Sequence, residues 1–435
     1  MSERSDYVSI EIDGQRIDTW TEYRVESDML TPADSFELTL SLGLGRGASQ
    51  RREWDRVREL CAPHAEVQLF IGADVTGGSR RRALQLTGRI DRRRSEVSRE
   101  QGATLIISGR DRAAYLCDSD TPIGLLRGLS ANAEFIDVAR AAVQPWGIEV
   151  ISDASASRNL LTGAQGLTPG QRLEVEAAVA QGIPRQFVTR SVIRRAAAEQ
   201  KPVADVVGVE PSARARARSS SGLTPSDVER QRVREASPRP GESVWTFLER
   251  HAERLGIMMW MSPRGQLILG APNYNADPLY AFIQRFENDA QSPNNCTIHR
   301  SESGAGQYSS VMVLGPTHGS DATRARVRVV VTDPSMPFAR PHVEQRHDCT
   351  TEDLAARAAK RILREGVASA DALDVYAPDH GMGRYLYAID TTASVIDEYS
   401  GVDDTRYVTS RTFERSREAG TRTLLHLVPL NSLTL

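Results

Sequence analysis

The chain has 435 residues, enough for two to four domains of about 100–200 residues each. Apolar residues make up 40% of the chain and charged residues 26%, a balance that is typical of folded proteins and excludes an intrinsically disordered one. The formal net charge is -3, so the overall charge does not indicate a protein that binds nucleic acid or an anionic membrane.

The four cysteines lie far apart and form no C-x-x-C pair: Cys61, Cys117, Cys296 and Cys349. Cysteine this sparse makes neither a disulfide framework nor a zinc site, and it fits a protein made in a reducing cytoplasm. The N-terminus lacks the basic start and apolar core of a signal peptide. The longest apolar run, Ile257–Met261, has the length of a strand and falls short of the ~18 residues of a membrane span.

The first 118 residues are predicted to be all-β. Val8, Ile10 and Ile12 alternate with polar residues and lead into Asp13-Gly14, a strong signal for a hairpin turn. The same alternation predicts further strands, over Phe36–Leu42, Val67–Ile71, Leu84–Leu86 and Thr104–Ser108. Short strands separated by turn residues indicate a barrel or a sandwich, with one candidate helix over Arg51–Leu60.

The middle of the chain mixes helix and strand. A helix is predicted over Ala133–Gln144 and a short strand over Ile148–Ile151. The block 154–240 has few large apolar residues, and its candidate helices are Gln171–Gln181 and Pro225–Glu235. We interpret this block as an insertion.

An arginine-rich run lies within the insertion. Arg214, Arg216 and Arg218 alternate with alanine and precede three serines and a glycine, a low-complexity composition that predicts a mobile linker. The alternative is an interface for nucleic acid or for an acidic partner. We favour the linker because the run is short and has no interleaved aromatic residues.

The stretch Pro240–Pro272 changes its hydrophobic period from helical to strand-like. Trp245 and Leu248 lie on one apolar stripe at helical spacing. Gly256 is expected to end this helix, because glycine adopts a positive φ without strain. Two short strands and a turn are then predicted, at Ile257–Met261, Gly265 and Gln266–Leu269.

From Asn294 onward the chain is again predicted to be β. The candidate strands are Ser310–Leu314, Val327–Thr332, Tyr385–Ile389, Arg406–Phe413 and Arg422–Leu430. One helix interrupts them. Thr350–Asp353 resembles a capping box, and the helix continues over Glu352–Glu365 to Gly366.

Common enzyme motifs are missing from the sequence. It contains no G-x-S-x-G elbow, no H-E-x-x-H helix and no P-loop. The densest group of candidate metal ligands is His342, His347, Asp348 and Cys349. Its spacing fits no common metal template, and a polar connection between a strand and a helix explains it equally well.

Two other polar groups have simple explanations. Asp379-His380 is followed by glycines and has the chemistry of a turn. Carboxylate pairs such as Asp403-Asp404 are expected by chance among 57 acidic residues, and a glycosidase needs two carboxyls held at a set distance in a cleft. We therefore predict no catalytic, cofactor-binding or metal-binding residue, and no enzyme.

Several segments together resemble one family of proteins. They are Pro240–Pro272, the opening Val8–Leu40 with Gly14 and Trp20, the strand pair ending in Gly109-Arg110-Asp111, and the C-terminal Glu352–Glu365, Tyr385–Ile389 and Thr421–Pro429. The family is that of the baseplate hub proteins of contractile phage tails, of the phage Mu type also called late-control-D-like, which is related to the hub part of VgrG. The resemblance covers most of the chain outside the insertion.

The resemblance implies a mostly β, α+β architecture in three parts. Residues 1–118 would form an N-terminal tube-like β-barrel domain, and residues 119–290 an α+β middle domain that contains the insertion at about 154–240. Residues 291–435 would form a C-terminal tube-like β-barrel domain with one helix at about 352–366. Eight residues are expected to hold this structure: Gly14, Trp20, Gly109, Arg110, Asp111, Trp245, Gly256 and Gly265.

The resemblance also implies a structural role. Family members form a homotrimer on the tail axis, so that two barrels in each subunit let a threefold hub join a sixfold tail tube to the central spike around a channel. The implied partners are the tail tube protein, the spike protein, other baseplate proteins and the tape-measure protein, with no cofactor. DNA would pass the channel without specific binding, the chain would not itself insert into a membrane, and it would lie in the virion baseplate after assembly in the bacterial cytoplasm.

Two other functions are kept as alternatives. One is a tail-associated peptidoglycan hydrolase with its active site in the middle domain. The other is a nucleic-acid-binding protein that uses Arg214–Arg218. If the chain is a hub, its channel should be polar or acidic, and the arginine-rich insertion should lie on the outside, because repeated arginine–phosphate contacts would retard DNA.

Overall fold

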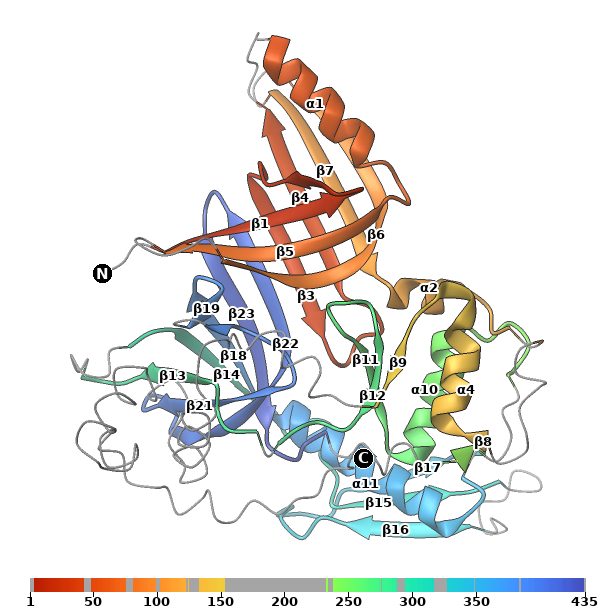
Figure 1. The fold of residues 1–435 in the computed structure, drawn as a ribbon. Coiled ribbons are helices and arrows are strands. Elements are labelled where there is room, and N and C mark those ends of the chain that lie inside the picture. Colours follow the sequence, from red (N-terminus) through yellow and green to blue (C-terminus); the bar gives the residue numbers. More distant parts are fainter. Residues whose placement is uncertain are drawn as a thin grey trace, which may run out of the picture.

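The structure, a computed structural model, describes residues 4–42, 48–75, 81–98, 102–122, 124, 133–152, 232–233, 238–274, 276–287, 294–316, 327–347, 349–382 and 385–433. Within these ranges the chain is mostly β with fewer helices, which confirms the predicted mostly β, α+β class (Figure 1). Almost all of the predicted insertion lies outside the described residues, including Gln171–Gln181 and Arg214–Arg218.

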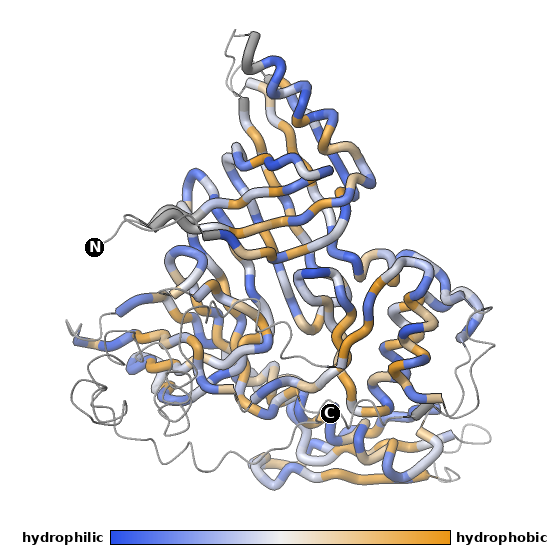
Figure 2. The backbone as a smooth tube through the Cα atoms, in the orientation of Figure 1, coloured by the Kyte–Doolittle hydropathy of each residue, from blue (hydrophilic) through white to orange (hydrophobic). Residues whose placement is uncertain are grey.

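The N-terminal quarter of the chain forms strands and one helix. The elements are β1 (Arg4–Ile12), β2 (Gln15–Ile17), β3 (Glu22–Asp28), β4 (Ser35–Leu42), α1 (Ala48–Leu60), β5 (Glu66–Val75), β6 (Arg81–Ser98) and β7 (Gly102–Asp111). Apolar and polar residues alternate along these strands (Figure 2), so each strand turns one face toward a buried core. The predicted hairpin between β1 and β2 is present, with Asp13 and Gly14 at φ 51° and 72°.

The C-terminal part supplies a second group of strands. They are β13 (Tyr280–Gln284), β14 (Thr297–Glu302), β18 (Asp371–Pro378), β19 (Gly381–Met382), β20 (Tyr385–Leu386), β21 (Thr391–Asp397), β22 (Val402–Ser416) and β23 (Gly420–Pro429). Strands β19 and β20 form a separate hairpin, while the others join the N-terminal strands in one large sheet.

The large sheet has the strand order β14-β18-β23-β22-β3-β4-β7-β6-β5-β1-β2, and β21 with β13 branches from β22. The pairing of β22 with β3 therefore links the two groups of strands. Among the described strands this path of pairing is open, so the two closed barrels expected from the sequence remain a prediction.

The middle region forms a helical layer against short strands. Its elements are α2 (Ala113–Asp118), β8 (Ala133–Glu134), α4 (Phe135–Val143), the 3-10 helix η1 (Gln144–Trp146), β9 (Val150–Ile151), β10 (Arg232–Val233), α10 (Val244–Leu255), β11 (Met258–Met261) and β12 (Leu267–Gly270). The apolar stripes of α4 and α10 pack against the β11–β12 hairpin in a core of their own.

A small sheet with one helix completes the fold. It consists of β15 (Ser310–Leu314), β16 (Arg328–Thr332), β17 (Pro341–Gln345) and α11 (Glu352–Ala370), and α11 packs against β15 and β16. Sequence analysis predicted β15 and β16 among the strands of the C-terminal domain. In the structure these two strands pair only within this small sheet.

Several elements differ from their sequence-based predictions. The helix predicted over Ala133–Gln144 begins only at Phe135, because Ala133–Glu134 pair as strand β8. Helix α11 runs past Glu365 to Ala370, because Ala368 and Ala370 are buried by packing. The strand predicted over Tyr385–Ile389 stops at Leu386. The helix predicted over Pro225–Glu235 is wrong at Arg232–Val233, which pairs with Ala133–Glu134 as strand β10.

None of the helices in the described ranges is long and apolar enough to cross a membrane.

Candidate interaction surface

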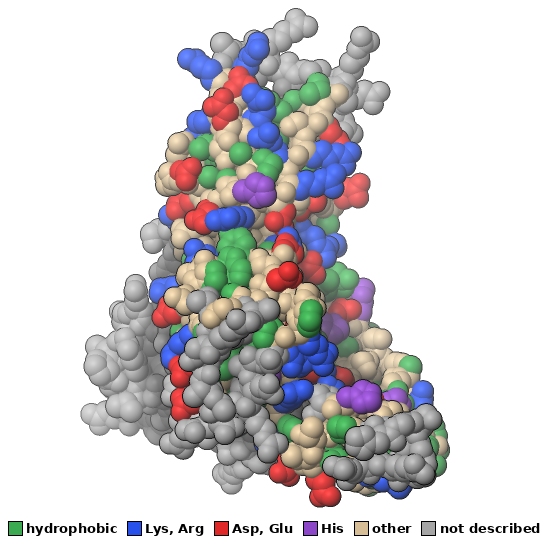
Figure 3. Space-filling view, turned by 90° about the vertical axis from the view of Figure 1, so that its right-hand side faces the viewer, with side chains coloured by type: hydrophobic (Ala, Val, Ile, Leu, Met, Phe, Trp, Pro, Cys, Tyr) green, Lys and Arg blue, Asp and Glu red, His purple; other side chains and the backbone are tan. Residues whose placement is uncertain are grey.

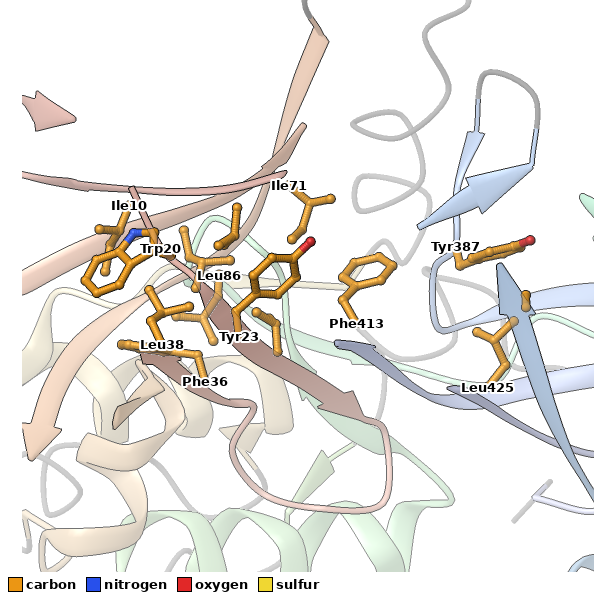
Figure 4. Packing of buried hydrophobic residues seen from close by; sticks show 14 of the residues in the cluster. Ile10, Trp20, Tyr23, Phe36, Leu38, Ile71, Leu86, Tyr387, Phe413 and Leu425 are labelled. Carbon is orange, nitrogen blue, oxygen red and sulfur yellow. The ribbon is translucent and has the colours of Figure 1, made fainter. Parts of the chain in front are cut away.

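The junction between β3 and β22 brings together residues almost 400 positions apart. The antiparallel register pairs Val25 with Phe413 and Ser27 with Arg411, so these four side chains point to the core. Figure 4 shows Phe413 between Tyr23 of the N-terminal strands and residues of the C-terminal strands. The core is therefore continuous from Ile10 near the N-terminus to Leu427 near the C-terminus.

The opposite face of the same strands is polar. Because side chains alternate along a strand, Glu22, Arg24, Glu26 and Asp28 of β3 point away from Val25. Cross-strand pairing continues this face into β4 and β22, where Arg24 lies opposite Glu37 on one side and Glu414 on the other. We call this surface the polar face and define it by Glu22, Arg24, Glu26, Asp28, Glu37, Glu414 and their register neighbours on β14, β18, β23, β7 and β6.

The centre of the polar face is acidic. Strands β3, β4 and β22 place five carboxylates on it against the single guanidinium of Arg24, whose Nη2 lies 3.4 Å from Glu26 Oε2. Burial raises the pKa of Asp28, and the neighbouring Glu26 carboxylate adds to this, while the Leu30 N–H and His426 act against it. The side of the molecule seen in Figure 3 has interspersed acidic and basic side chains over its upper, N-terminal part.

The flanks of the polar face carry ion pairs. On the C-terminal side His426 Nδ1 lies 2.7 Å from Asp374 Oδ1, and Arg422 pairs with Glu414. On the N-terminal side Arg110 donates to Asp91 Oδ2 at 2.6 Å and to Asp118 Oδ2 at 2.7 Å. Of the central carboxylates, Glu26 and Glu414 are paired with arginines, and β6 adds Arg92 and Arg94 at the flank, so the acidic character of the polar face is confined to its centre.

A buried arginine lies beneath the polar face, on the core side of β22. Arg411 donates from Nη1 to Gln85 Oε1 at 2.7 Å and to the Tyr387 carbonyl at 3.0 Å, and from Nη2 to Ser27 Oγ at 2.7 Å. Its guanidinium also lies 4.2 Å from the centre of the Phe413 ring. Burial lowers the pKa of Arg411 to about 10. This residue joins groups from both halves of the large sheet.

A histidine makes a second polar link across the junction. His380 is fully buried, with Nε2 2.7 Å from Tyr23 Oη and Nδ1 3.0 Å from Thr423 Oγ1. Its ring also packs against Phe413, at 4.7 Å between centroids. Sequence analysis attributed Asp379-His380 to a turn, and Asp379 does adopt φ 59°, but the neighbouring imidazole is part of the core.

The residues expected to hold the N-terminal part lie at separate structural positions. Trp20 is buried and donates to the Ile17 carbonyl at 3.1 Å. A side chain on Gly109 would meet the Arg89 carbonyl oxygen at 2.1 Å, so glycine lets β6 and β7 approach closely. Asp111 accepts a hydrogen bond from Ala113 N at 2.9 Å, at the start of α2.

The residues expected to hold the middle part surround α10 and its hairpin. Trp245 is buried in the helical core. Gly256 ends α10 at φ 73°, where its N–H reaches the Glu253 carbonyl at 3.2 Å, and Gly265 turns the β11–β12 hairpin at φ 75°. The eight predicted structural residues therefore do not gather at one site.

The described residues contain no group of three or more side chains suited to a metal ion. His342 stacks on Tyr308 at 4.5 Å between centroids, and Cys349 is buried against α11, while Asp348 lies outside the described ranges.

Sequence reasoning missed the polar face and the groups that join the two halves. The alternation of charged and apolar residues over Glu22–Asp28 could have indicated a strand with one solvent-exposed face. The strand that pairs with it could not be inferred from the sequence, since β22 lies far along the chain. Nothing in the sequence indicated that Arg411 is buried, because an arginine in a strand is usually exposed.

Comparison with known proteins gives two family matches. Residues 7–111 match the N-terminal domain of the family described as Mu phage baseplate assembly protein GpP-like. Residues 307–363 match the third domain of the family described as tail protein NMB1110-like. The resemblance to phage baseplate proteins that the sequence indicated is therefore confirmed. No curated protein sequence matches the chain.

Two solved structures share the fold over nearly the whole chain. A tail protein from Neisseria meningitidis MC58 is 20% identical, with a TM-score of 0.65, and the match covers 99% of this chain and 98% of that one. The 43 kDa tail protein of prophage MuSo2 from Shewanella oneidensis is 16% identical, with a TM-score of 0.63, and the match covers 99% of this chain and 100% of that one.

Proposed function

Because residues 7–111 carry a GpP-like baseplate domain and residues 307–363 a tail-protein domain, we propose that the chain is the structural hub of a phage-type baseplate. In this proposal three copies surround the tail axis and join a sixfold tail tube to a threefold central spike. The two groups of strands in each copy act as two tube-like modules, within residues 1–118 and 291–435, and residues 119–290 form the layer beside them. Three copies then present six modules to the tube.

The strand order supports ring formation by copies of the chain. The path β14-β18-β23-β22-β3-β4-β7-β6 contains eight strands, each antiparallel to the next. Its first and last strands therefore run in opposite directions. A rotation about the ring axis preserves strand direction, so β14 of one copy meets the end of β6 in the next copy as an antiparallel neighbour.

The edges at both ends of this path are available for such pairing. In the described residues β14 pairs only with β18, and the segment Arg92–Ser98 of β6 pairs only with β7. Unpaired edges of this kind favour the addition of a strand from another chain. Three copies supply 24 strands, three times eight. At ~4.8 Å between strands they form a ring roughly 37 Å wide before tilt.

The single observation that carries the proposal is the polar face on this continuous sheet. With the polar face inward, Glu26, Glu37 and Glu414 of three copies line the channel. Carboxylates repel phosphate, so DNA would pass such a channel without being held. The implied partners are those of a hub: further copies of the chain, the tail tube protein, the spike protein, other baseplate proteins and the tape-measure protein. The place of action is the virion tail baseplate, after assembly in the bacterial cytoplasm.

In this proposal the chain is not an enzyme and uses no cofactor. The alternative, a tail-associated peptidoglycan hydrolase, requires two carboxyls facing each other across a substrate cleft. Release of soluble fragments from purified peptidoglycan would favour that alternative over the hub.

The mass of the purified chain in solution tests the proposal. We expect a species of about three times the 47.9 kDa of one chain, at least when the spike or tube partner is added. Negative-stain class averages of that species should show threefold rings with a central hole and six lobes. A monomer that stays monomeric with both partners present, and forms no ring, would contradict the proposal.

A further inference from the structure

The free edge of β6 directs a defined set of main-chain groups outward. Along an antiparallel strand, successive residues turn their N–H and C=O groups to alternate sides. Asp111 N donates to the Asp34 carbonyl, so the odd-numbered residues of β7 bond toward β4 and the even-numbered ones toward β6. The register of β6 with β7 therefore leaves the main-chain groups of Arg93, Ser95 and Val97 directed to the free edge.

The free edge of β14 has the same construction. Ser303 N donates to the Ala370 carbonyl and continues the β14–β18 register, so the odd-numbered residues of β14 bond toward β18. The main-chain groups of Ile298, Arg300 and Glu302 are therefore directed outward. In the part of the chain that the structure describes, no other strand pairs with this edge.

On both edges the outward-bonding residues are also the ones whose side chains lie on the core side of the sheet. Arg93 is directly opposite the buried Ile107 of β7, and Ile298 is directly opposite the buried Val375 of β18. We call the pairing of the β6 edge of one copy with the β14 edge of the next the joint. The joint can form its hydrogen bonds and keep the core side and the polar face each continuous, which a shift of one residue on either strand would prevent.

One register of the joint uses both edges fully. It places Val97 opposite Ile298, and continues with Ser95 opposite Arg300 and Arg93 opposite Glu302, which gives three hydrogen-bonded pairs. A shift of two residues in either direction keeps the two sides of the sheet continuous but leaves only two such pairs within the strands.

The core-side side chains favour the same register. Val97 is 76% exposed, more than any other large apolar side chain that the structure describes, and in this register it meets the half-buried Ile298. The side chain of Glu302 is 66% exposed while it pairs with Arg300 at 2.8 Å, so it can also receive Arg93. The shifted registers place either Arg93 or Val97 opposite Arg300, which makes a like-charge pair or an apolar–charged pair.

The side chains on the polar face agree with this choice. The register places Glu96 opposite His299 and Arg94 opposite Ser301. Glu96 already pairs with Arg94 on its own strand, and the His299 ring packs on Tyr376 at 5.1 Å between centroids. A shift of two residues in one direction would instead bring Arg94 against His299.

We propose that copies of the chain join in this one register, with Val97 of one copy opposite Ile298 of the next and Arg93 opposite Glu302. The partner of each edge is a second copy of this chain, and the residues on the two edges specify both the partner and its position along the strand. The inference rests on the proposed function in taking pairing between β6 and β14 as the contact between copies. It deepens that function by naming the residues that fix the contact.

Disulfides between copies test the register. Glu96 and His299 form a non-hydrogen-bonded pair in it, and the Cα atoms of such a pair lie about 4.5 Å apart, within the range of a disulfide. We expect the assembled full-length Glu96→Cys/His299→Cys variant to form covalent dimers and trimers on mild oxidation, seen on denaturing non-reducing gels. Glu96→Cys combined with Thr297→Cys or with Ser301→Cys reports the shifted registers and should cross-link at least about tenfold more slowly. Glu96→Cys alone controls for the native Cys296.

The outcomes separate the register from the ring. Faster cross-linking through Thr297→Cys or Ser301→Cys would overturn the register and leave the joint between β6 and β14 standing. A threefold ring that cross-links in none of the three registers would overturn the joint and leave the hub standing. A chain that stays monomeric with its partners present would contradict the proposed function, and the register with it.

A second variant tests the apolar contact at the joint without a disulfide. Val97→Asp should leave the fold of the single chain intact, because this side chain is exposed. It should raise the concentration needed for half-maximal assembly at least about tenfold, since the contact with Ile298 is lost. Val330→Asp is the matched control, because Val330 is 48% exposed on β16, a strand that belongs to neither edge. Equal assembly of the Val97→Asp and Val330→Asp variants, measured by sedimentation velocity, would overturn the proposal.

Discussion

Arg411 on β22 donates a hydrogen bond from Nη2 to Ser27 Oγ on β3, at 2.7 Å, across the strand pair that links the two halves of the large sheet. The same guanidinium reaches Gln85 on β6 and the Tyr387 carbonyl. One side chain therefore ties strands from both ends of the chain to each other, directly beneath the polar face.

Removing this guanidinium should destabilise the fold. Arg411→Met keeps much of the side-chain volume but leaves Gln85 Oε1, Ser27 Oγ and the Tyr387 carbonyl without their donor. We expect the free energy of unfolding to fall by about 2–4 kcal/mol, measured by urea denaturation. Arg415→Met, an exposed change on the same strand, should stay within about 0.5 kcal/mol. A loss below about 1 kcal/mol for Arg411→Met would show that the link is dispensable.

Asp34 should make stability depend on pH. Burial raises its pKa to about 6, although hydrogen bonding to Ser27 and the charge of Arg411 act against this. Because the folded pKa is above the unfolded one, the contribution of Asp34 is present below about pH 4 and is lost as pH rises through about 6. We expect Asp34→Asn to be more stable than the unchanged chain at pH 7.5, by about 1–2 kcal/mol, and nearly equal at pH 4.

The pH comparison has a direct control. Asp18→Asn alters a carboxylate that is exposed, so its effect should be small at both pH values. The burial account of Asp34 fails if Asp34→Asn is less stable than the unchanged chain at pH 7.5.

Gly109 should not tolerate a side chain. A Cβ atom there would lie 2.1 Å from the Arg89 carbonyl oxygen and 2.7 Å from the Phe36 ring, so β6, β7 and β4 would have to separate. Gly109→Ala should therefore lower the free energy of unfolding by about 2–4 kcal/mol in thermal or urea denaturation. Gly304→Ala is the matched control, because nothing lies within 4 Å of its added carbon. Similar stabilities of the two variants would refute this close approach.

Reversing the charge of the polar face should make the channel retain DNA. In the assembled ring, Glu26→Lys, Glu37→Lys and Glu414→Lys together replace nine carboxylates with ammonium groups, three from each copy. We expect duplex DNA to bind this variant at least about tenfold more tightly at 50 mM salt, and the gain to fall steeply with salt. Fluorescence anisotropy with labelled DNA measures it.

The matched control places the same charges elsewhere. Glu53→Lys, Asp55→Lys and Glu59→Lys put three ammonium groups on α1, outside the polar face. DNA binding by this variant that equals binding by the polar-face variant would argue against a channel lined by the polar face.

Local features of the fold could be predicted from the sequence, since their causes are local. Asp13-Gly14, Gly256 and Gly265 each mark a backbone position with positive φ, and the structure has a turn or a helix end at each. The N-cap at Thr351 was also predictable, and its Oγ1 accepts from Leu354 N at 3.3 Å.

Long-range features could not be predicted from the sequence. The pairing of β3 with β22 depends on tertiary packing between Val25 and Phe413, for which no pattern within either strand gives the partner. The buried roles of Arg411 and His380 are likewise set by neighbours from distant strands. The surface pocket lined by Met29, Trp245 and Ala368 arises only where elements far apart in the sequence meet, so the sequence showed Trp245 as a core residue and nothing more.

The most direct test of the account is a cryo-electron microscopy reconstruction of the assembled chain that resolves strand positions around the axis. The account predicts a threefold ring in which β3, β4 and β22 line the channel, with Glu26, Glu37 and Glu414 facing it and β14 of each copy beside β6 of the next. A ring with these carboxylates on its outer surface, or with α10 and α11 lining the channel, would contradict the account.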